Sequence, residues 1–138
     1  MPKALSVLVW LRLARVFQKI DRLSEVHLRT WDLNVAQFDV LAQVGSAKGI
    51  TQQELANRLL VTKGNISQLL DRLEQRGLIM RAQEGRTNML FLTDPGQRLY
   101  TKVVPAQEDM IAGQISSLTE EEQKQLLALL RKLDQTIC

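Results

Sequence analysis

The spacing of apolar and polar residues divides this chain into helices with one interruption. Apolar residues recur every three or four positions through most of the sequence, which is typical of amphipathic helices. The predicted helices cover residues 4–29, about 35–46, about 52–59, 62–76, and two segments that begin near 94 and 120. After Gly77 two short strand-like runs flank the turn sequence EGRT. The pattern therefore predicts a mainly α protein with one small β-hairpin.

Capping residues mark where the helices begin and end. An N-cap side chain followed three residues later by Glu or Gln satisfies two free backbone amides and favours a helix start. This pattern, or an N-cap residue alone, occurs at Asn34–Gln37, Thr51–Glu54, Thr62, Thr93 and Thr119–Glu122. Gly77 is suited to ending the fourth helix, because glycine readily adopts the left-handed conformation found there. Pro105 lies inside the fifth helix and is expected to bend or interrupt it.

The short third helix and the fourth helix are joined by a tight connection, which is helix-turn-helix geometry. In such a unit the second helix enters the major groove of DNA, and its first residues contact base edges. The beginning of the fourth helix carries hydrogen-bonding residues and no acid, namely Thr62, Lys63, Asn65, Ser67 and Gln68. Asn and Gln can pair with adenine, and Lys with guanine or phosphate. The alternative is an ordinary amphipathic helix with a polar end, which the hairpin that follows makes less favourable.

The hairpin is expected to be a wing whose tip carries Arg86 and Thr87. The Arg86 side chain is long and cationic enough to reach a narrow minor groove, and the alternative is a solvated loop tip. Arg72 is a candidate phosphate contact. Alternatively, Arg72 and the nearby Arg76 pair only with acids of their own helix, such as Asp71 and Glu74.

Composition and charge fit one intracellular domain with a basic surface. The chain has 138 residues and a formal net charge of +3. Residues 3–29 carry six Lys or Arg against two acids, residues 58–86 six against three, and residues 105–138 three against six. The apolar run at 4–11 is too short to span a bilayer. A soluble cytoplasmic protein that does not enter a membrane is the expectation.

The same residues argue against an enzyme and against a metal or cofactor site. The chain has no Gly-rich phosphate loop, and its one histidine, His27, continues the apolar face of the first helix. His27 is expected to pack and to satisfy one hydrogen bond rather than bind metal, because no second histidine is available. Cys138 is the last residue, and a frayed thiol is the favoured interpretation over a redox sensor.

At this point the sequence resembles the MarR family of winged helix-turn-helix regulators. The resemblance rests most specifically on the segment from Thr51 to Gly96, which includes TQQELANRLLVTKGNISQLLDRLEQRGLI and a hairpin ending in LFLT. It implies one MarR-like domain over 1–138, with a winged helix-turn-helix lobe at 34–96 and dimerisation helices at 1–33 and 97–138. It also implies a homodimer that binds a pseudo-palindromic operator in double-stranded DNA, often as a repressor released by a small molecule or by oxidation.

The family motif transfers to particular positions of this chain. The residues on the recognition-helix positions are Thr62, Lys63, Asn65, Ser67, Gln68 and Arg72. The wing pattern of the family corresponds to Glu84-Gly85-Arg86, with Arg86 as the minor-groove residue, Glu84 as its brace and Thr87 beside it. Gln68 stands where many members have Arg, and the wing is a few residues shorter than usual. These two departures favour, weakly, an alternative in which the scaffold is a protein-interaction module with little sequence-specific DNA binding.

An effector cavity between the dimerisation layer and the DNA-binding lobe is a further implication of the resemblance. Relatives bind aromatic acids there, so a small aromatic or phenolic effector is the expected ligand. The candidate lining residues are Arg12, Arg15, Phe17, Trp31 and Phe38, with Arg12 or Arg15 holding a carboxylate. The alternative is that the aromatic residues at these spacings are part of the hydrophobic core.

Overall fold

The structure is a computed structural model, and it describes residues 2–59 and 63–137. Its elements are α1 (Pro2–Arg29), α2 (Val35–Ala47), β1 (Ile50–Thr51), α3 (Gln52–Leu59), α4 (Lys63–Gln75), β2 (Ile79–Glu84), β3 (Thr87–Leu92), α5 (Asp94–Ile115) and α6 (Glu120–Thr136). The predicted mainly α fold with a small hairpin is confirmed. The short strand β1 was not predicted, and it makes the hairpin the larger part of a three-stranded sheet of order β1-β3-β2.

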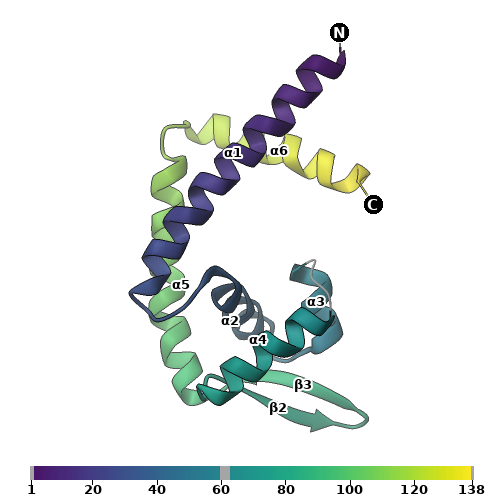
Figure 1. The fold of residues 1–138 in the computed structure, drawn as a ribbon, viewed down its shortest axis with the longest axis vertical. Helices are drawn as coiled ribbons and strands as arrows, with labels where there is room; N and C mark the ends of the chain where they lie inside the picture. The colour runs from purple at the N-terminus through teal and green to yellow at the C-terminus, as the bar shows by residue number, and fades with distance from the viewer. Residues whose placement is uncertain (1, 60–62, 138) are drawn as a thin grey trace.

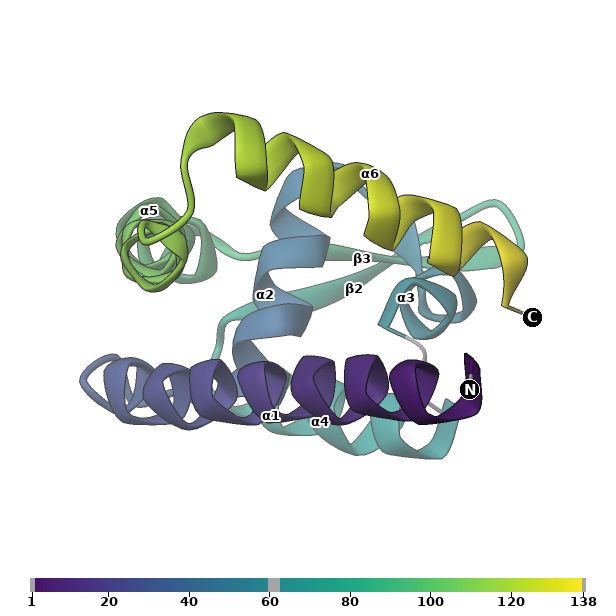
Figure 2. The ribbon, with the colours of Figure 1, turned by 90° about the horizontal axis from the view of Figure 1, so that it is seen from above.

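The elements form a lobe at one end of a long helical frame (Figure 1). Helices α2, α3 and α4 and the hairpin make up the lobe, and α5 runs from the lobe to the far end of the molecule. The C-terminal part of α1 packs against α5 and the two helices cross obliquely, and α6 follows α5 after a turn (Figure 1). Viewed from above, α1 and α6 lie on opposite sides and extend away from α5, so that both termini lie at the same end (Figure 2).

Two clusters of buried side chains hold the frame and the lobe together. The larger cluster fills the lobe and consists mainly of Val40, Val44, Ile50, Leu55, Ala56, Ile66, Leu70, Leu73, Leu78, Ile79 and Leu90. The smaller one joins α1 and α5 to α2 through Leu28, Leu33, Leu41 and Val103. Burial of such side chains contributes about 1.5–3 kcal/mol each. In α1 only the part from about residue 20 onward packs within the chain, so most of its predicted apolar face is exposed.

The helix ends follow the predicted capping. Reciprocal hydrogen bonds form the capping boxes of Asn34 with Gln37 and of Thr119 with Glu122. The same pair of bonds joins Thr51 and Glu54. Gly77 has a φ of 72° and ends α4 with the amides of Gly77 and Leu78 bonded to carbonyls of the last turn, which is a Schellman motif. The predicted N-cap Thr62 lies outside the described residues.

Pro105 does not interrupt α5, contrary to one of the two expected effects. The helix continues from Asp94 to Ile115 with the proline inside it. Its neighbours explain why, because Val103 before the proline and Gln107 after it are both buried. The packing of these two residues, one before and one after the proline in sequence, offsets the backbone hydrogen bond that the proline removes.

Candidate nucleic-acid interface and adjoining cavity

Helix α4 has one fully buried face and one exposed polar face. Ile66, Leu70 and Leu73 are 0% exposed and fix the helix in the lobe. Opposite them, Asn65, Gln68 and Arg72 follow one another at steps of three and four residues, so they share a helix face. These three side chains line one depression of about 320 Å³ together with Leu69 and with Ala36 of α2. Three of the predicted DNA-contacting residues therefore lie on one surface.

Ser67 plays a different part from its neighbours. Its hydroxyl accepts a hydrogen bond of 2.7 Å from Nε2 of Gln52, the first residue of α3. Ser67 is only partly exposed, and the bond links the two helices of the helix-turn-helix unit. No local sequence signal marks Gln52, because the two residues lie fifteen positions apart.

Two predicted contacts are at the edge of what the structure describes. Thr62 lies outside the described residues, and Lys63 is the first residue of α4. Lys63 precedes Asn65 by two residues in the first turn of α4. Both remain predictions.

The arginines near the end of α4 do not pair as the alternative interpretation proposed. Arg81 of β2 forms ion pairs with both acids of α4, with Nε 3.1 Å from Glu74 and Nη2 3.3 Å from Asp71. Arg76 instead lies 3.6 Å from Asp32 in the loop after α1. Among the residues that the structure describes, Arg72 forms no ion pair and is exposed. A phosphate contact is therefore open to Arg72.

The wing tip presents its polar residues to solvent. Glu84 and Thr87 are paired in register, and the two residues between them, Gly85 and Arg86, form the turn. Gly85 has a φ of 64°, as the first residue of a tight hairpin turn requires. Glu84, Arg86 and Thr87 are all exposed. Within the described part of the chain no ion pair joins Glu84 to Arg86, so the expected brace is not observed, and Gln83 bonds the Gly85 carbonyl at 3.2 Å.

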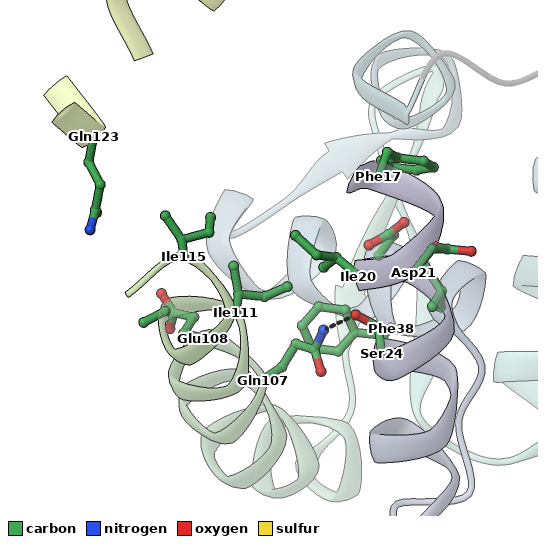
Figure 3. A pocket seen from close by; sticks show the side chains of 13 residues that line it. Phe17, Ile20, Asp21, Ser24, Phe38, Gln107, Glu108, Ile111, Ile115 and Gln123 are labelled. Carbon is green, nitrogen blue, oxygen red and sulfur yellow. Dashed lines mark hydrogen bonds between the residues drawn. The ribbon is translucent and has the colours of Figure 1, made fainter. Parts of the chain in front are cut away.

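A cavity of about 590 Å³ lies between α1, α2 and α5, with Gln123 of α6 at its margin (Figure 3). It is lined by Phe17, Ile20, Asp21, Ser24, Val35, Phe38, Asp39, Gln107, Glu108, Ile111, Ala112, Ile115 and Gln123. Of the candidate effector residues, Phe17 and Phe38 line this cavity, whereas Arg12, Arg15 and Trp31 do not. Their role in binding an effector stays a prediction.

The helix geometry explains why Phe17 lines the cavity and Arg15 does not. Phe17, Asp21 and Ser24 recur at steps of four and three and turn one face of α1 toward α5. Arg15 lies on another face, where it borders a small depression with Gln18, Lys19 and Arg22. Trp31 packs instead against the smaller buried cluster.

A polar chain of hydrogen bonds forms one wall of the cavity. Gln107, which is 6% exposed, donates from Nε2 to Ser24 Oγ at 3.0 Å, as the dashed line in Figure 3 shows. Its Oε1 lies 2.8 Å from Nδ1 of His27. The expected role of His27 as a packed, hydrogen-bonded residue agrees with this contact. The chain fixes α1 against α5 beside the cavity.

The acids of the cavity repel one another. Burial raises the pKa of the Asp39 carboxyl above its ordinary value, and the negative charge of Asp21 raises the pKa further.

In the described residues, no helix is both long and apolar enough to cross a bilayer.

Comparisons with known proteins agree with this architecture. A family model described as the MarR family matches residues 31–86. An HTH-type transcriptional regulator of Bacillus cereus is 42% identical over 130 residues, which cover 91% of this chain and 86% of the relative. A solved structure of a mutant MarR from E. coli complexed with operator DNA has a TM-score of 0.82 and 31% identity, and the match covers 93% of this chain and 95% of that one. The S. aureus MepR–DNA complex has a TM-score of 0.81 and 25% identity, with coverage of 91% and 95%.

Proposed function

The chain belongs to the MarR family of HTH-type transcriptional regulators, and from this premise we propose that it binds a pseudo-palindromic operator in double-stranded DNA as a homodimer. The observation that carries the proposal is the single exposed face of α4 formed by Asn65, Gln68 and Arg72. Amide and guanidinium groups on a helix of this kind can read base edges and bind phosphates in a major groove. The relatives from E. coli and S. aureus were solved with DNA.

The wing supplies the second contact in this proposal. Arg86 and Thr87 stand exposed at the hairpin tip, and the guanidinium is free to enter an adjacent minor groove. Thr62 and Lys63 add contacts at the beginning of the recognition helix.

Exposed apolar residues on α1 and α6 support the homodimer. Trp10 is 62% exposed, Phe17 68% and Leu129 64%. The remaining large ones on α6 are Leu126, Leu127, Leu130 and Leu133, and α6 has no buried residue. Large apolar side chains exposed along two helices are typical of an interface, and a second copy of the chain can cover both helices in a symmetric dimer. Two recognition helices then meet half-sites roughly one helical turn apart.

We propose repression with release by a small effector as the regulatory mode. An effector in the cavity between α1, α2 and α5 favours a dimer whose recognition helices no longer match the two half-sites. Such a shift requires only that the effector bind one arrangement more tightly than the other.

Selection from random duplex DNA, followed by a salt series on the winning sequence, tests the proposal. We expect the selected sequence to be palindromic. The affinity of the protein for it should fall steeply with added salt, because each neutralised phosphate releases counterions. Absence of any enriched sequence contradicts it and favours the protein-interaction module. Sedimentation at micromolar concentration tests the dimer, and a monomer there removes the case for two half-sites.

A further inference from the structure

The cavity between α1, α2 and α5 is acidic. Asp21 comes from α1, Asp39 from α2 and Glu108 from α5, and no Lys, Arg or His belongs to the lining. Asp21 and Asp39 are partly buried, while Glu108 is exposed. None of the ion pairs among the described residues involves these three carboxylates. The described residues thus supply no cation to pair with these carboxylates.

The basic residues of α1 do not compensate for these acids. Arg15, Lys19 and Arg22 gather around a separate depression with Gln18. Nor do the acids form a metal site, because no group of three or more potential ligands lies within reach of one ion in the part of the chain that is described. A bound organic cation can supply the counter-charge that the described residues do not.

The rest of the lining suits an apolar ligand body. Aromatic and aliphatic side chains from α1, α2 and α5 face the space, and Figure 3 shows Phe17 and Ile20 on one side with Ile111 and Ile115 on the other. A volume of about 590 Å³ lies within the range of small-molecule sites. Phe17 and Phe38 can stack on a ring or lie against a cationic group.

One buried polar group is also available to a ligand. Ser24, which is 4% exposed, accepts a hydrogen bond from the side-chain amide of Gln107, and its own hydroxyl donates no hydrogen bond among the described residues. The hydroxyl borders the cavity and can bond a hydroxyl or ether oxygen of a bound molecule.

We propose that this cavity binds an amphipathic organic cation, an aromatic or aliphatic amine in its protonated form, and not an aromatic acid. The ammonium group lies beside Asp21 and Asp39, and the apolar body lies between the phenylalanines and the isoleucines. The proposal rests on the proposed function in one respect, since it names the chemical class of the effector that releases DNA.

Charge repulsion within the cavity gives the cation its advantage. Burial and the charge of Asp21 raise the pKa of Asp39, so the empty cavity holds two carboxylates at a cost. A bound ammonium removes that cost, and a bound carboxylate adds to it. The other charged group that faces the space is Glu108, and α6 contributes only the neutral Gln123. All charges at the site therefore favour a cation.

Three ligands with one ring system and different charges test the proposal. They are 1-naphthylmethylammonium, the neutral 1-naphthylmethanol and 1-naphthoate, each titrated calorimetrically into the full-length protein at pH 7.5. We expect the cation to bind about tenfold or more tightly than the alcohol, and the alcohol more tightly than the acid. Equal or tighter binding of the acid overturns the proposal, and so does failure of all three to bind, as occurs if a second copy of the chain fills the cavity.

Variants locate the binding site. Asp39→Asn and Asp21→Asn are each expected to weaken the cation about fivefold to tenfold and to leave the alcohol unchanged. The matched control is Asp109→Asn, which removes the same charge from an exposed position of α5 outside the lining. An equal loss in the control contradicts a local contact.

A separate measurement distinguishes the cavity proposal from the proposed function. Fluorescence anisotropy of the selected DNA, with and without the cation, reports release. Binding of the cation without release of DNA preserves the ligand class and contradicts only its role as effector. Absence of DNA binding before any ligand is added contradicts the proposed function alone.

Discussion

Nε2 of Gln52 donates a hydrogen bond of 2.7 Å to Oγ of Ser67, and this contact ties the beginning of α3 to the recognition helix. A hydroxyl held in this way is oriented by the protein before any DNA arrives. We therefore expect Ser67 to position α4, while the exposed residues Asn65, Gln68 and Arg72 are the proposed contacts with DNA.

Loss of the Gln52 side chain is expected to weaken DNA binding without changing which sequence is preferred. Gln52→Ala removes one hydrogen bond worth about 1 kcal/mol, so affinity should fall about fivefold on all sequences alike. Gln53→Ala is the control, because Gln53 is exposed and bonds Asn57 within the same helix. Anisotropy titrations on several DNA sequences measure both, and a changed base preference for Gln52→Ala speaks against a purely positioning role.

Gln68→Ala is expected to change base preference at one position of each half-site. A bidentate amide–base contact is worth about 1–3 kcal/mol of discrimination, so the loss should fall on the preferred sequence. Gln75→Ala removes the same side chain from the far end of α4 and serves as control. A uniform loss on every sequence refutes base reading by Gln68.

Arg86→Ala is expected to weaken binding most on operators with A·T-rich flanks, where the minor groove is narrow and strongly negative. Removing one positive charge that lies near the phosphates should also make the affinity for DNA less dependent on salt concentration. Arg98→Ala, at an exposed position of α5 outside the hairpin, removes the same charge and serves as control. Unchanged affinity on A·T-rich flanks means that this short wing does not insert.

Gly96→Ala is expected to destabilise the fold by about 1–3 kcal/mol through overpacking. A Cβ at residue 96 comes within 1.9 Å of the Leu78 carbonyl oxygen, a backbone atom that cannot swing aside. Gly113→Ala in the same helix meets nothing within 4 Å and should instead stabilise by up to about 1 kcal/mol. Urea unfolding compares the two, and equal effects contradict the close approach.

Asp39→Asn is expected to raise the melting temperature at neutral pH. The folded-state pKa of Asp39 lies above the ordinary 3.8, so the folded protein binds more protons between those two values. The free energy of unfolding therefore falls as pH rises through that window, and the charged residue costs stability above it. The gain should be less than about 1 kcal/mol, because solvent screens a partly exposed group.

Thermal unfolding of Asp39→Asn at several pH values measures this effect, with Asp109→Asn as control. The difference from wild type should disappear below pH 3.8, where both states of the wild-type protein are protonated. A stabilisation that stays constant across the whole pH range contradicts an electrostatic origin.

The helices and their ends were predictable because their signals are local. Capping pairs such as Asn34 with Gln37 act across three residues. The apolar spacing of α4 predicts a buried face of Ile66, Leu69, Leu70 and Leu73, of which all but the partly buried Leu69 are fully buried. Strand β1 was missed for the opposite reason. It consists of two residues that pair with Leu90 and Met89 of β3, some forty positions away, and it has no pattern of its own.

The candidate site divides in the same way. Helical periodicity was sufficient to place Asn65, Gln68 and Arg72 together. The partners of Arg81 and the lining of the cavity depend on how separate elements meet, and a sequence pattern carries no signal for that. Arg12 or Arg15 was expected to hold the carboxylate of an effector, but Arg15 borders a separate depression on another face of α1.

The close approach of Gly96 to Leu78 means that a tilt of α5 is transmitted to the DNA-binding lobe. Its first turn is pressed against the end of the recognition helix and the start of the wing, while its later turns line the cavity. The helix has 22 residues and is about 33 Å long. A tilt of about 5° at one end displaces the other by about 3 Å, a large fraction of the spacing between neighbouring base pairs. Under the proposed function, a ligand that shifts α5 slightly against α1 would therefore move helix α4 out of register with the DNA without contacting α4.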